Sequence, residues 1–208
     1  MNCSVILPAY NEEKRIENCL NTLVSILPRA CEVVVAADGC TDKTVTLARH
    51  FPVRIVSCSE RLGKGGGILN AAKTAENNNI VFCDVDLPVH PRNIPEIAKM
   101  LKTADLVVGI RQVTGYPLHR RILSLGFNLI FRLMFHIPIR DTQCGFKAVK
   151  KNVLTNLGLQ VTGYGFDVEL IVKAHRQGYR ISEFPVEWHY QEGSKVNVVR
   201  QVFLWRWS

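Results

Sequence analysis

Short apolar runs alternate with amphipathic segments along the first half of the chain. Runs rich in β-branched residues predict five strands, at residues 3–7, 32–37, 53–56, 80–83 and 106–110. Apolar positions at spacings of three and four predict the intervening helices, at about 16–27, 42–50, 67–76 and 91–101. Fully apolar strands that alternate with helices are typical of a mainly parallel sheet with helices on both faces. The sequence therefore predicts an α/β fold.

The pattern changes after about residue 110. Residues 118–139 form a long stretch that is both apolar and basic, and a strand, a helix and a last strand are predicted at 144–149, 165–177 and 179–186. No internal repeat or low-complexity linker interrupts the chain. We therefore expect a single domain over residues 1–208, with one half at about 1–110 and a second subregion at about 111–208.

The charge of the chain is uneven. It has 208 residues, of which 47% are hydrophobic and 21% are charged, and a net charge of +8. Residues 111–151 hold one acid, Asp141, and eight cations: Arg111, Arg120, Arg121, Arg132, Arg140, Lys147, Lys150 and Lys151. An anionic partner is expected at this segment, although part of these cations can simply solvate a helix face. No groove-reading motif accompanies them, so nucleic acid is not the expected partner.

Cysteines and apolar runs indicate the compartment. The seven cysteines form no CxxC pair, which argues against a disulfide framework and a structural zinc site. No signal peptide and no transmembrane helix are predicted, so we expect a cytoplasmic location with peripheral membrane contact. Residues 118–139 and 196–208 combine apolar and basic side chains, which suits a membrane interface; a buried core helix and a docked terminal helix are the alternatives.

Two carboxylates follow the strand at 80–83. Asp84 and Asp86, separated by Val85, can approach a hard divalent cation that neutralises a diphosphate. A solvated turn at a strand end is the alternative reading of such a motif.

Three further loops carry candidate ligands for an anion or a nucleotide. Residues 61–67 (RLGKGGG) place Lys64 and several glycines before a helix, which suits an anion, although a flexible helix entry is equally compatible. The loops after the first two strands supply an aromatic ring at Tyr10 and carboxylates at Glu12 and Asp38. In a parallel sheet, all these loops meet at the carboxyl ends of the strands.

Eight blocks follow one another between about residues 3 and 197: VILPAYNEE, VVVAADGCTD, RLGKGGG, FCDVDLP, VVGIRQ, RDTQCGFK, GFDVEL and EGSK. In this order and spacing they resemble family-two glycosyltransferases with the nucleotide-sugar-binding A-type fold. Within that family the chain most resembles the branch of dolichyl-phosphate glucosyltransferases and dolichol-phosphate mannose synthases. The resemblance implies an α/β fold with a mainly parallel central sheet, a Rossmann-like nucleotide-binding half and an acceptor-binding, membrane-facing second subregion.

The resemblance also implies the roles of individual residues. The nucleotide-sugar donor would be bound by Pro8, Ala9, Tyr10, Glu12, Asp38, Lys64, Asp84 and Val85, and Mg²⁺ or Mn²⁺ by Asp84 and Asp86. The phosphate of the acceptor would be bound by Arg111, Arg120, Arg121, Ser194 and Lys195, and the catalytic residues would be Asp86, Asp141 and Arg121. Two positions depart from the usual pattern: Ala37 replaces the first of two adjacent acids, and Pro88 replaces a glutamine common in mannose synthases.

The implied reaction is inverting transfer of a hexose from UDP-glucose or GDP-mannose to a polyprenyl phosphate. A phosphate acceptor is mostly anionic at neutral pH and needs cations, whereas a sugar hydroxyl needs a base such as Asp141, Asp167 or Glu169. Asp141 can instead pair with Arg140 or orient an acceptor-site arginine. A soluble glycan acceptor and a noncatalytic nucleotide-sugar-binding module are the alternatives, and a homo-oligomer or a membrane partner subunit stays open.

Overall fold

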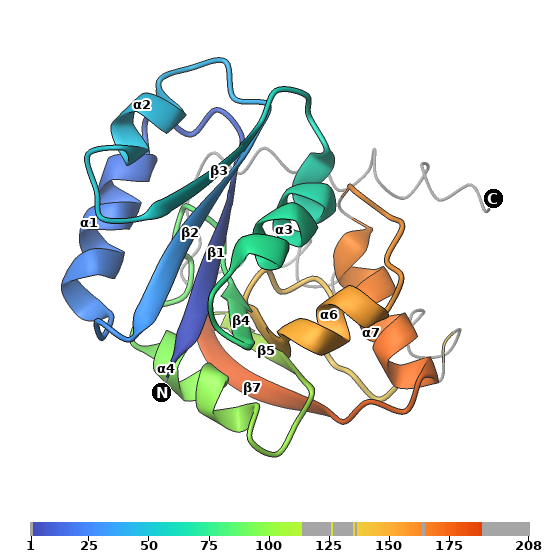
Figure 1. The fold of residues 1–208 in the computed structure, drawn as a ribbon. Coiled ribbons are helices and arrows are strands. Elements are labelled where there is room, and N and C mark those ends of the chain that lie inside the picture. Colours follow the sequence, from blue (N-terminus) through green and yellow to red (C-terminus); the bar gives the residue numbers. More distant parts are fainter. Residues whose placement is uncertain (1, 114–125, 127–134, 136, 164, 189–208) are drawn as a thin grey trace.

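The structure is a computed structural model that describes residues 2–113, 126, 135, 137–163 and 165–188 (Figure 1). Its strands form one seven-stranded sheet in the order β3-β2-β1-β4-β6-β5-β7. Their bounds are β1 Cys3–Ala9, β2 Cys31–Asp38, β3 Arg54–Cys58, β4 Asn79–Phe82, β5 Leu106–Val113, β6 Lys147–Lys150 and β7 Ile181–Trp188. All pairings are parallel except those of β6, which is antiparallel to both β4 and β5. The predicted mainly parallel sheet is therefore confirmed.

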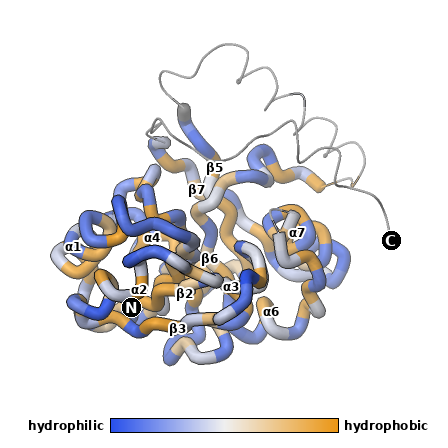
Figure 2. The backbone as a smooth tube through the Cα atoms, turned by 90° about the horizontal axis from the view of Figure 1, so that it is seen from above, coloured by the Kyte–Doolittle hydropathy of each residue, from blue (hydrophilic) through white to orange (hydrophobic). Residues whose placement is uncertain are grey.

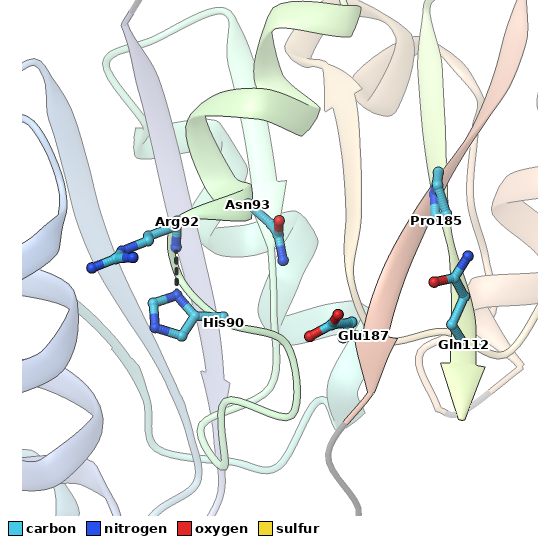
Figure 3. Close-up of a pocket in the computed structure, with 6 residues that line it drawn as sticks. All are labelled: His90, Arg92, Asn93, Gln112, Pro185 and Glu187. Carbon is cyan, nitrogen blue, oxygen red and sulfur yellow. Dashed lines mark hydrogen bonds between the residues drawn. The ribbon is translucent and has the colours of Figure 1, made fainter. Parts of the chain in front are cut away.

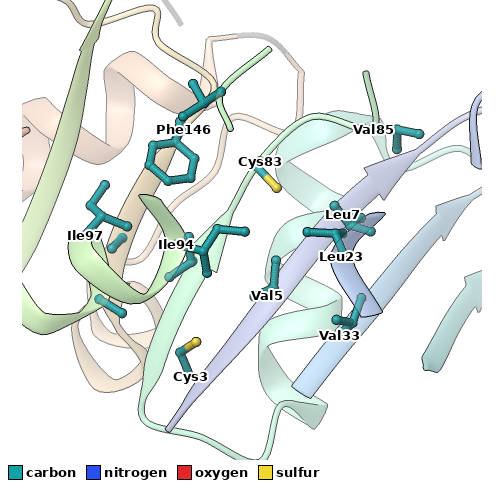
Figure 4. Close-up of a cluster of buried hydrophobic side chains, with 14 of the residues drawn as sticks. Cys3, Val5, Leu7, Leu23, Val33, Cys83, Val85, Ile94, Ile97 and Phe146 are labelled. Carbon is teal, nitrogen blue, oxygen red and sulfur yellow. The ribbon is translucent and has the colours of Figure 1, made fainter. Parts of the chain in front are cut away.

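Helices cover both faces of this sheet. One face packs against α1 (Ile16–Ile26), α2 (Thr44–Ala48) and α4 (Asn93–Met100), and the other against α3 (Gly63–Thr74), α6 (Lys151–Asn156) and α7 (Phe166–Arg176). The first layer includes the cluster in Figure 4, where α1 and α4 pack on β1 and β4. Hydrophobic residues run along the central strands, whereas α1 and α4 alternate in hydropathy, because only one side of each helix is buried (Figure 2).

Strand β6 determines where the loop before it lies. Since β6 is antiparallel, its first residue, Lys147, pairs with Phe82 near the carboxyl end of β4 and with Val108 in β5. Residues 140–146 therefore reach the edge of the sheet at which the parallel strands end. The antiparallel direction of β6 thus places residues 140–146 of the second subregion next to the loops that follow the parallel strands of the first half.

Three elements differ from the sequence prediction. Helix α3 begins at Gly63, so the glycines form its first turn and do not precede it. Strand β6 covers only Lys147–Lys150, and α6 follows it directly at a segment where no helix was predicted. Most of residues 118–139 lies outside the described residues, as does 196–208, so their predicted membrane contact stays a prediction. Within the described ranges, no helix has the length and apolarity needed to cross a bilayer.

Candidate active site

The candidate donor residues lie at one edge of the sheet. Pro8 and Ala9 end β1, Asp38 ends β2, and residues 84–86 directly follow β4. Because β2, β1 and β4 are adjacent and parallel, their carboxyl ends lie side by side. Lys64 joins them from the first turn of α3.

Asp38 holds the start of α3. Its side chain is buried, and its two carboxylate oxygens accept hydrogen bonds from the backbone N–H groups of Leu62 (2.5 Å) and Gly63 (2.8 Å). These groups are otherwise unpaired at a helix N-terminus, so the carboxylate serves as a cap. In this structure Asp38 positions the helix that carries Lys64, and the direct nucleotide contact that the family resemblance implies stays a prediction.

The glycines of α3 allow close packing against the start of α7 and the segment before it. The backbone N–H of Gly65 donates to the Thr162 carbonyl oxygen at 2.7 Å. A Cβ atom at Gly65 would overlap the Phe166 side chain, and one at Gly63 would overlap the Thr162 carbonyl. In this structure the glycine-rich stretch is therefore the packed first turn of a helix, and its role in binding an anion stays a prediction.

Tyr10 and Arg61 form a flat cationic surface beside α3. The guanidinium carbon of Arg61 lies 3.8 Å from the centroid of the Tyr10 ring. The sequence identifies Arg61 and Lys64 as the two cations of the RLGKGGG block, but it gives no signal that Arg61 stacks on Tyr10. The neighbouring Glu12 pairs with Arg15 at 3.1 Å, and its backbone N–H donates to Thr44. Tyr10 and Glu12 therefore already have partners from this chain.

Four charged side chains form a partly buried network behind Asp84. The Lys64 ammonium lies 2.9 Å from Asp84 Oδ1 and 3.7 Å from Asp167 Oδ2. Asp167 in turn lies 2.6 Å from the Nζ of Lys147, which is fully buried and also donates to the Cys144 carbonyl. Burial alone would lower the pKa of Lys64, but Asp84 and Asp167 raise it above its ordinary value. Burial alone would raise the pKa of Asp167, but Lys147 and Lys64 hold it below its ordinary value.

Asp86 has an unsatisfied oxygen. Its Oδ1 is buried and has no hydrogen-bond partner in the described part of the chain. Burial, and the nearby charge of Asp84, raise the pKa of Asp86. A buried carboxylate oxygen without a partner is costly unless a cation binds it, so Asp84 and Asp86 fit a hard divalent ion. No group of three or more His, Cys, Asp or Glu side chains within the described ranges can hold a metal, so these two residues would leave positions for other oxygen ligands.

Backbone with a positive φ occurs in the loops after β1 and β4, where the parallel strands end. Leu87 has a φ of 45° and Asn11 a φ of 53°, and they are the non-glycine residues with positive φ that the described segments contain. Strained backbone of this kind clusters at functional sites. Val85, which was assigned to the donor, packs its side chain into the core at 5% exposure, so only its backbone is available to a ligand.

Arg111 and Asp141 form a second polar cluster on the acceptor side. The guanidinium donates to Asp141 Oδ2 at 2.6 Å and to Oδ1 at 2.8 Å, and the Arg111 backbone N–H donates to the same carboxylate. Arg111 also lies over the Trp188 ring, with its guanidinium carbon 5.3 Å from the centroid. Asp141 is buried and fully engaged, so it orients Arg111 and is poorly placed to act as a base. Of the roles predicted for Asp141, the structure therefore favours the orientation of an arginine.

Most described cations of the basic segment have an acidic partner. Four of the five described ones form ion pairs: Arg111 with Asp141, Arg140 with Glu183, Lys147 with Asp167 and Lys150 with Asp105. The fifth, Lys151, donates to the backbone carbonyls of Lys73 and Ala75. The expected anion-binding excess is therefore smaller than the residue count predicts. Arg120, Arg121, Arg132, Ser194 and Lys195 lie outside the described residues.

A cavity of about 380 Å³ lies between the start of α4 and the ends of β5 and β7 (Figure 3). It is lined by His90, Arg92, Asn93, Gln112, Pro185 and Glu187, and Asp84 and Asp86 are not among them. Gln112 is the residue after Arg111 and pairs in register with Glu187. Sequence reasoning had no signal for this cavity, because it depends on the pairing of two strands that are far apart in the chain.

Comparisons with known proteins agree on one family. The family model described as Glycosyl transferase family 2 matches residues 4–158. The chain is 35% identical over 217 residues to glycosyltransferase AglD of Haloferax volcanii, with 96% of this chain and 35% of that protein covered. It is 30% identical to the dolichyl-phosphate beta-glucosyltransferase of Drosophila melanogaster, with 100% of this chain and 71% of that protein covered. The chain thus spans only about a third of the length of AglD.

Solved structures of glucosyl-3-phosphoglycerate synthase from Mycobacterium tuberculosis share the fold. The complex with UDP has a TM-score of 0.76 at 22% identity and covers 97% of this chain and 77% of that chain. The complex with Mn²⁺, UDP and phosphoglyceric acid has a TM-score of 0.74 at 22% identity, and covers 91% and 71%. The predicted A-type architecture is therefore confirmed.

Proposed function

Because the chain belongs to glycosyl transferase family 2, we propose that it transfers a hexose from a nucleoside diphosphate sugar to a polyprenyl phosphate of the dolichyl type, with inversion. The name of the Drosophila relative supports this acceptor and favours a glucosyl donor such as UDP-glucose over GDP-mannose. The observation that carries the proposal is the unpartnered Asp86 oxygen, which lies in the loop after β4 next to Asp84 and its Lys64 partner.

The donor side of the site supplies positive charge where the leaving group develops negative charge. A Mg²⁺ or Mn²⁺ ion bound by Asp84 and Asp86 would stabilise the departing diphosphate. Lys64 projects from the first turn of α3, close enough to Asp84 to contact the same diphosphate. Arg61, stacked on Tyr10, adds a second cation and a flat surface beside this position.

The acceptor side favours a phosphate over a sugar hydroxyl. Attack by a hydroxyl requires a free carboxylate as base, whereas a phosphate monoester is already anionic. Each of the three candidate bases pairs with a cation: Asp141 with Arg111, Asp167 with Lys147 and Glu169 with Lys173. Arg111, oriented by Asp141, would bind the acceptor phosphate, together with the predicted ligands Arg120, Arg121, Ser194 and Lys195.

A polyprenyl acceptor also requires a membrane surface. We propose that the protein works peripherally on the cytoplasmic face of a membrane, with residues 118–139 and 196–208 as the contact. Sedimentation with anionic liposomes tests this: the full chain should sediment with them, and deletion of residues 198–208 should weaken binding. Equal sedimentation of the two proteins would contradict the anchor.

The transfer assay offers UDP-glucose or GDP-mannose to a short polyprenyl phosphate, with Mg²⁺, with Mn²⁺ and with EDTA. We expect glucosyl transfer that EDTA abolishes and that Asp86→Ala lowers at least ~100-fold, the usual scale for loss of a transition-state charge contact. Lys99→Met, on the exposed side of α4, is the matched control and should retain full activity. Transfer by Asp86→Ala at the wild-type rate would contradict the proposed metal site. If the wild type and the variants all bind the donor but none transfers the sugar, a noncatalytic binding module is favoured.

A further inference from the structure

Lys64 lies between two carboxylates of unequal exposure. Its Nζ is 2.9 Å from Asp84 Oδ1 and 3.7 Å from Asp167 Oδ2, and its own side chain is only 16% exposed. The Asp84 side chain is 34% exposed, whereas that of Asp167 is 7% exposed. A single ammonium group thus bridges the candidate metal site and the buried side of the network.

The backbone at Lys64 is fixed, so only its side chain can change partner. The N–H of Gly63 donates to Asp38 and that of Gly65 to the Thr162 carbonyl. A lysine side chain has a flexible four-carbon stem. A small rotation therefore suffices to exchange Asp84 for Asp167.

Asp84 and Asp167 differ in how much they depend on Lys64 as a counter-ion. Asp167 already has Lys147 at 2.6 Å, so it keeps a counter-ion when Lys64 points away. Asp84 has the carboxylate of Asp86 two residues along the chain, and within the described residues Lys64 is the one cation that forms an ion pair with it. Without another cation, Lys64 is therefore most stable at Asp84.

We propose that Lys64 is a built-in counter-ion that makes divalent-cation binding at Asp84 and Asp86 depend on the donor diphosphate. This inference rests on the proposed function. A cation at Asp84 repels Lys64 and displaces it from the carboxylate. The diphosphate offers the displaced ammonium new oxygen partners, and Asp167, held by Lys147, positions it within reach. Metal and donor then favour each other's binding, and linkage requires the effect to be reciprocal.

Electron paramagnetic resonance of Mn²⁺ measures this coupling without turnover. Mn²⁺ is titrated into the wild-type chain alone, with UDP and with GDP, after correction for Mn²⁺ bound by free nucleotide. One of the two nucleotides is part of the true donor sugar. We expect this nucleotide to lower the Kd of Mn²⁺ by ~10-fold, which lies within the ~5–150-fold range of coupled sites. Lys64→Met should bind Mn²⁺ more tightly than wild type in the absence of nucleotide. Adding the nucleotide should then increase its Mn²⁺ affinity less than it does in the wild type. Lys99→Met should behave as wild type.

A second variant gives the opposite shift. Asp167→Asn removes the alternative partner, so Lys64 stays at Asp84 and Mn²⁺ alone should bind more weakly than to wild type. If Lys64→Met binds Mn²⁺ alone with wild-type affinity and retains the full nucleotide effect, the role of Lys64 is overturned while the proposed function stands. If the wild-type chain binds no Mn²⁺ with either nucleotide, the metal site of the proposed function itself is overturned.

Discussion

Lys147 provides a direct test of the buried charge network. Its side chain is 0% exposed, and its Nζ lies 2.6 Å from Asp167 Oδ1. Lys147→Met retains the length of the side chain but leaves Asp167 with one ion-pair partner among the described residues, Lys64 at 3.7 Å. Breaking a buried ion pair by removing one partner costs ~3–5 kcal/mol. The remaining lysine compensates in part, so we expect a loss of about 3 kcal/mol in the free energy of unfolding.

Urea denaturation and thermal unfolding measure this loss. About 3 kcal/mol corresponds to a decrease of ~6–12 °C in Tm for a chain of this size. The control is Lys173→Met, because Lys173 pairs with Glu169 one helical turn away and is 31% exposed. A pair of this spacing at the protein surface contributes only ~0.3–0.5 kcal/mol, and the partial burial of this one still leaves it far more exposed than the Lys147–Asp167 pair. Equal small losses in the two variants would refute the importance of the buried pair.

The pH dependence gives a second signature of the same variant. In the wild type, burial would raise the pKa of Asp167, but Lys147 and Lys64 hold it below its ordinary value. Its stabilisation is therefore present above pH ~4 and is lost only as the pH falls through the lowered pKa. In Lys147→Met, burial dominates and the pKa rises, so protonation relieves the buried charge. The deficit relative to wild type should shrink as the pH is lowered from about 8 to about 5, whereas a pH-independent deficit would indicate lost packing alone.

Two further predictions concern a glycine and a thiol. A methyl group at Gly145 would overlap the Asp84 carboxylate, so Gly145→Ala should weaken Mn²⁺ binding and transfer at least ~10-fold, whereas Gly163→Ala, where a Cβ meets no atom within 4 Å, should not. Cys31 lies 2.7 Å, sulfur to sulfur, from Cys3, and this hydrogen bond lowers the pKa of Cys31 to about 7. Its alkylation by iodoacetamide, followed by mass spectrometry, should therefore rise between pH ~6 and ~8 and then level off, and a midpoint near ~8.5 would contradict the assignment.

The parallel strands were predictable because each is apolar along most of its length. Strands buried on both faces carry this signal locally, and the five in the first half were found within a few residues of their ends. A strand was predicted at 144–149, but β6 covers only Lys147–Lys150, and the signal for its bounds is weak because its four residues begin and end with lysine. Lys147 is buried there only because Asp167, twenty positions away in the sequence, neutralises it. Helix α6 was missed because it starts directly at the end of this weak strand.

Candidate site residues were predictable where a strand end places them. Asp84 and Asp86 follow an apolar strand, so their position at the sheet edge needed no tertiary information. Partners from other elements were not predictable, because they depend on packing between elements. The cap that Asp38 provides to α3 is one example. The basic segment is another, since Asp105 and Glu183, which pair with two of its cations, lie outside it.

The antiparallel strand β6 also constrains the order in which the sheet can be completed during synthesis. Strands β1 to β4 pair among themselves and leave the ribosome first, so they can form a four-stranded sheet early. Strand β5 emerges next, but its partners within the described residues, β6 and β7, begin only at residues 147 and 181. A nascent chain that ends before residue 147 therefore exposes one open edge at β4 and a second unpaired strand, both of which invite intermolecular pairing. Stalled or truncated chains of that length are the ones that most need a chaperone.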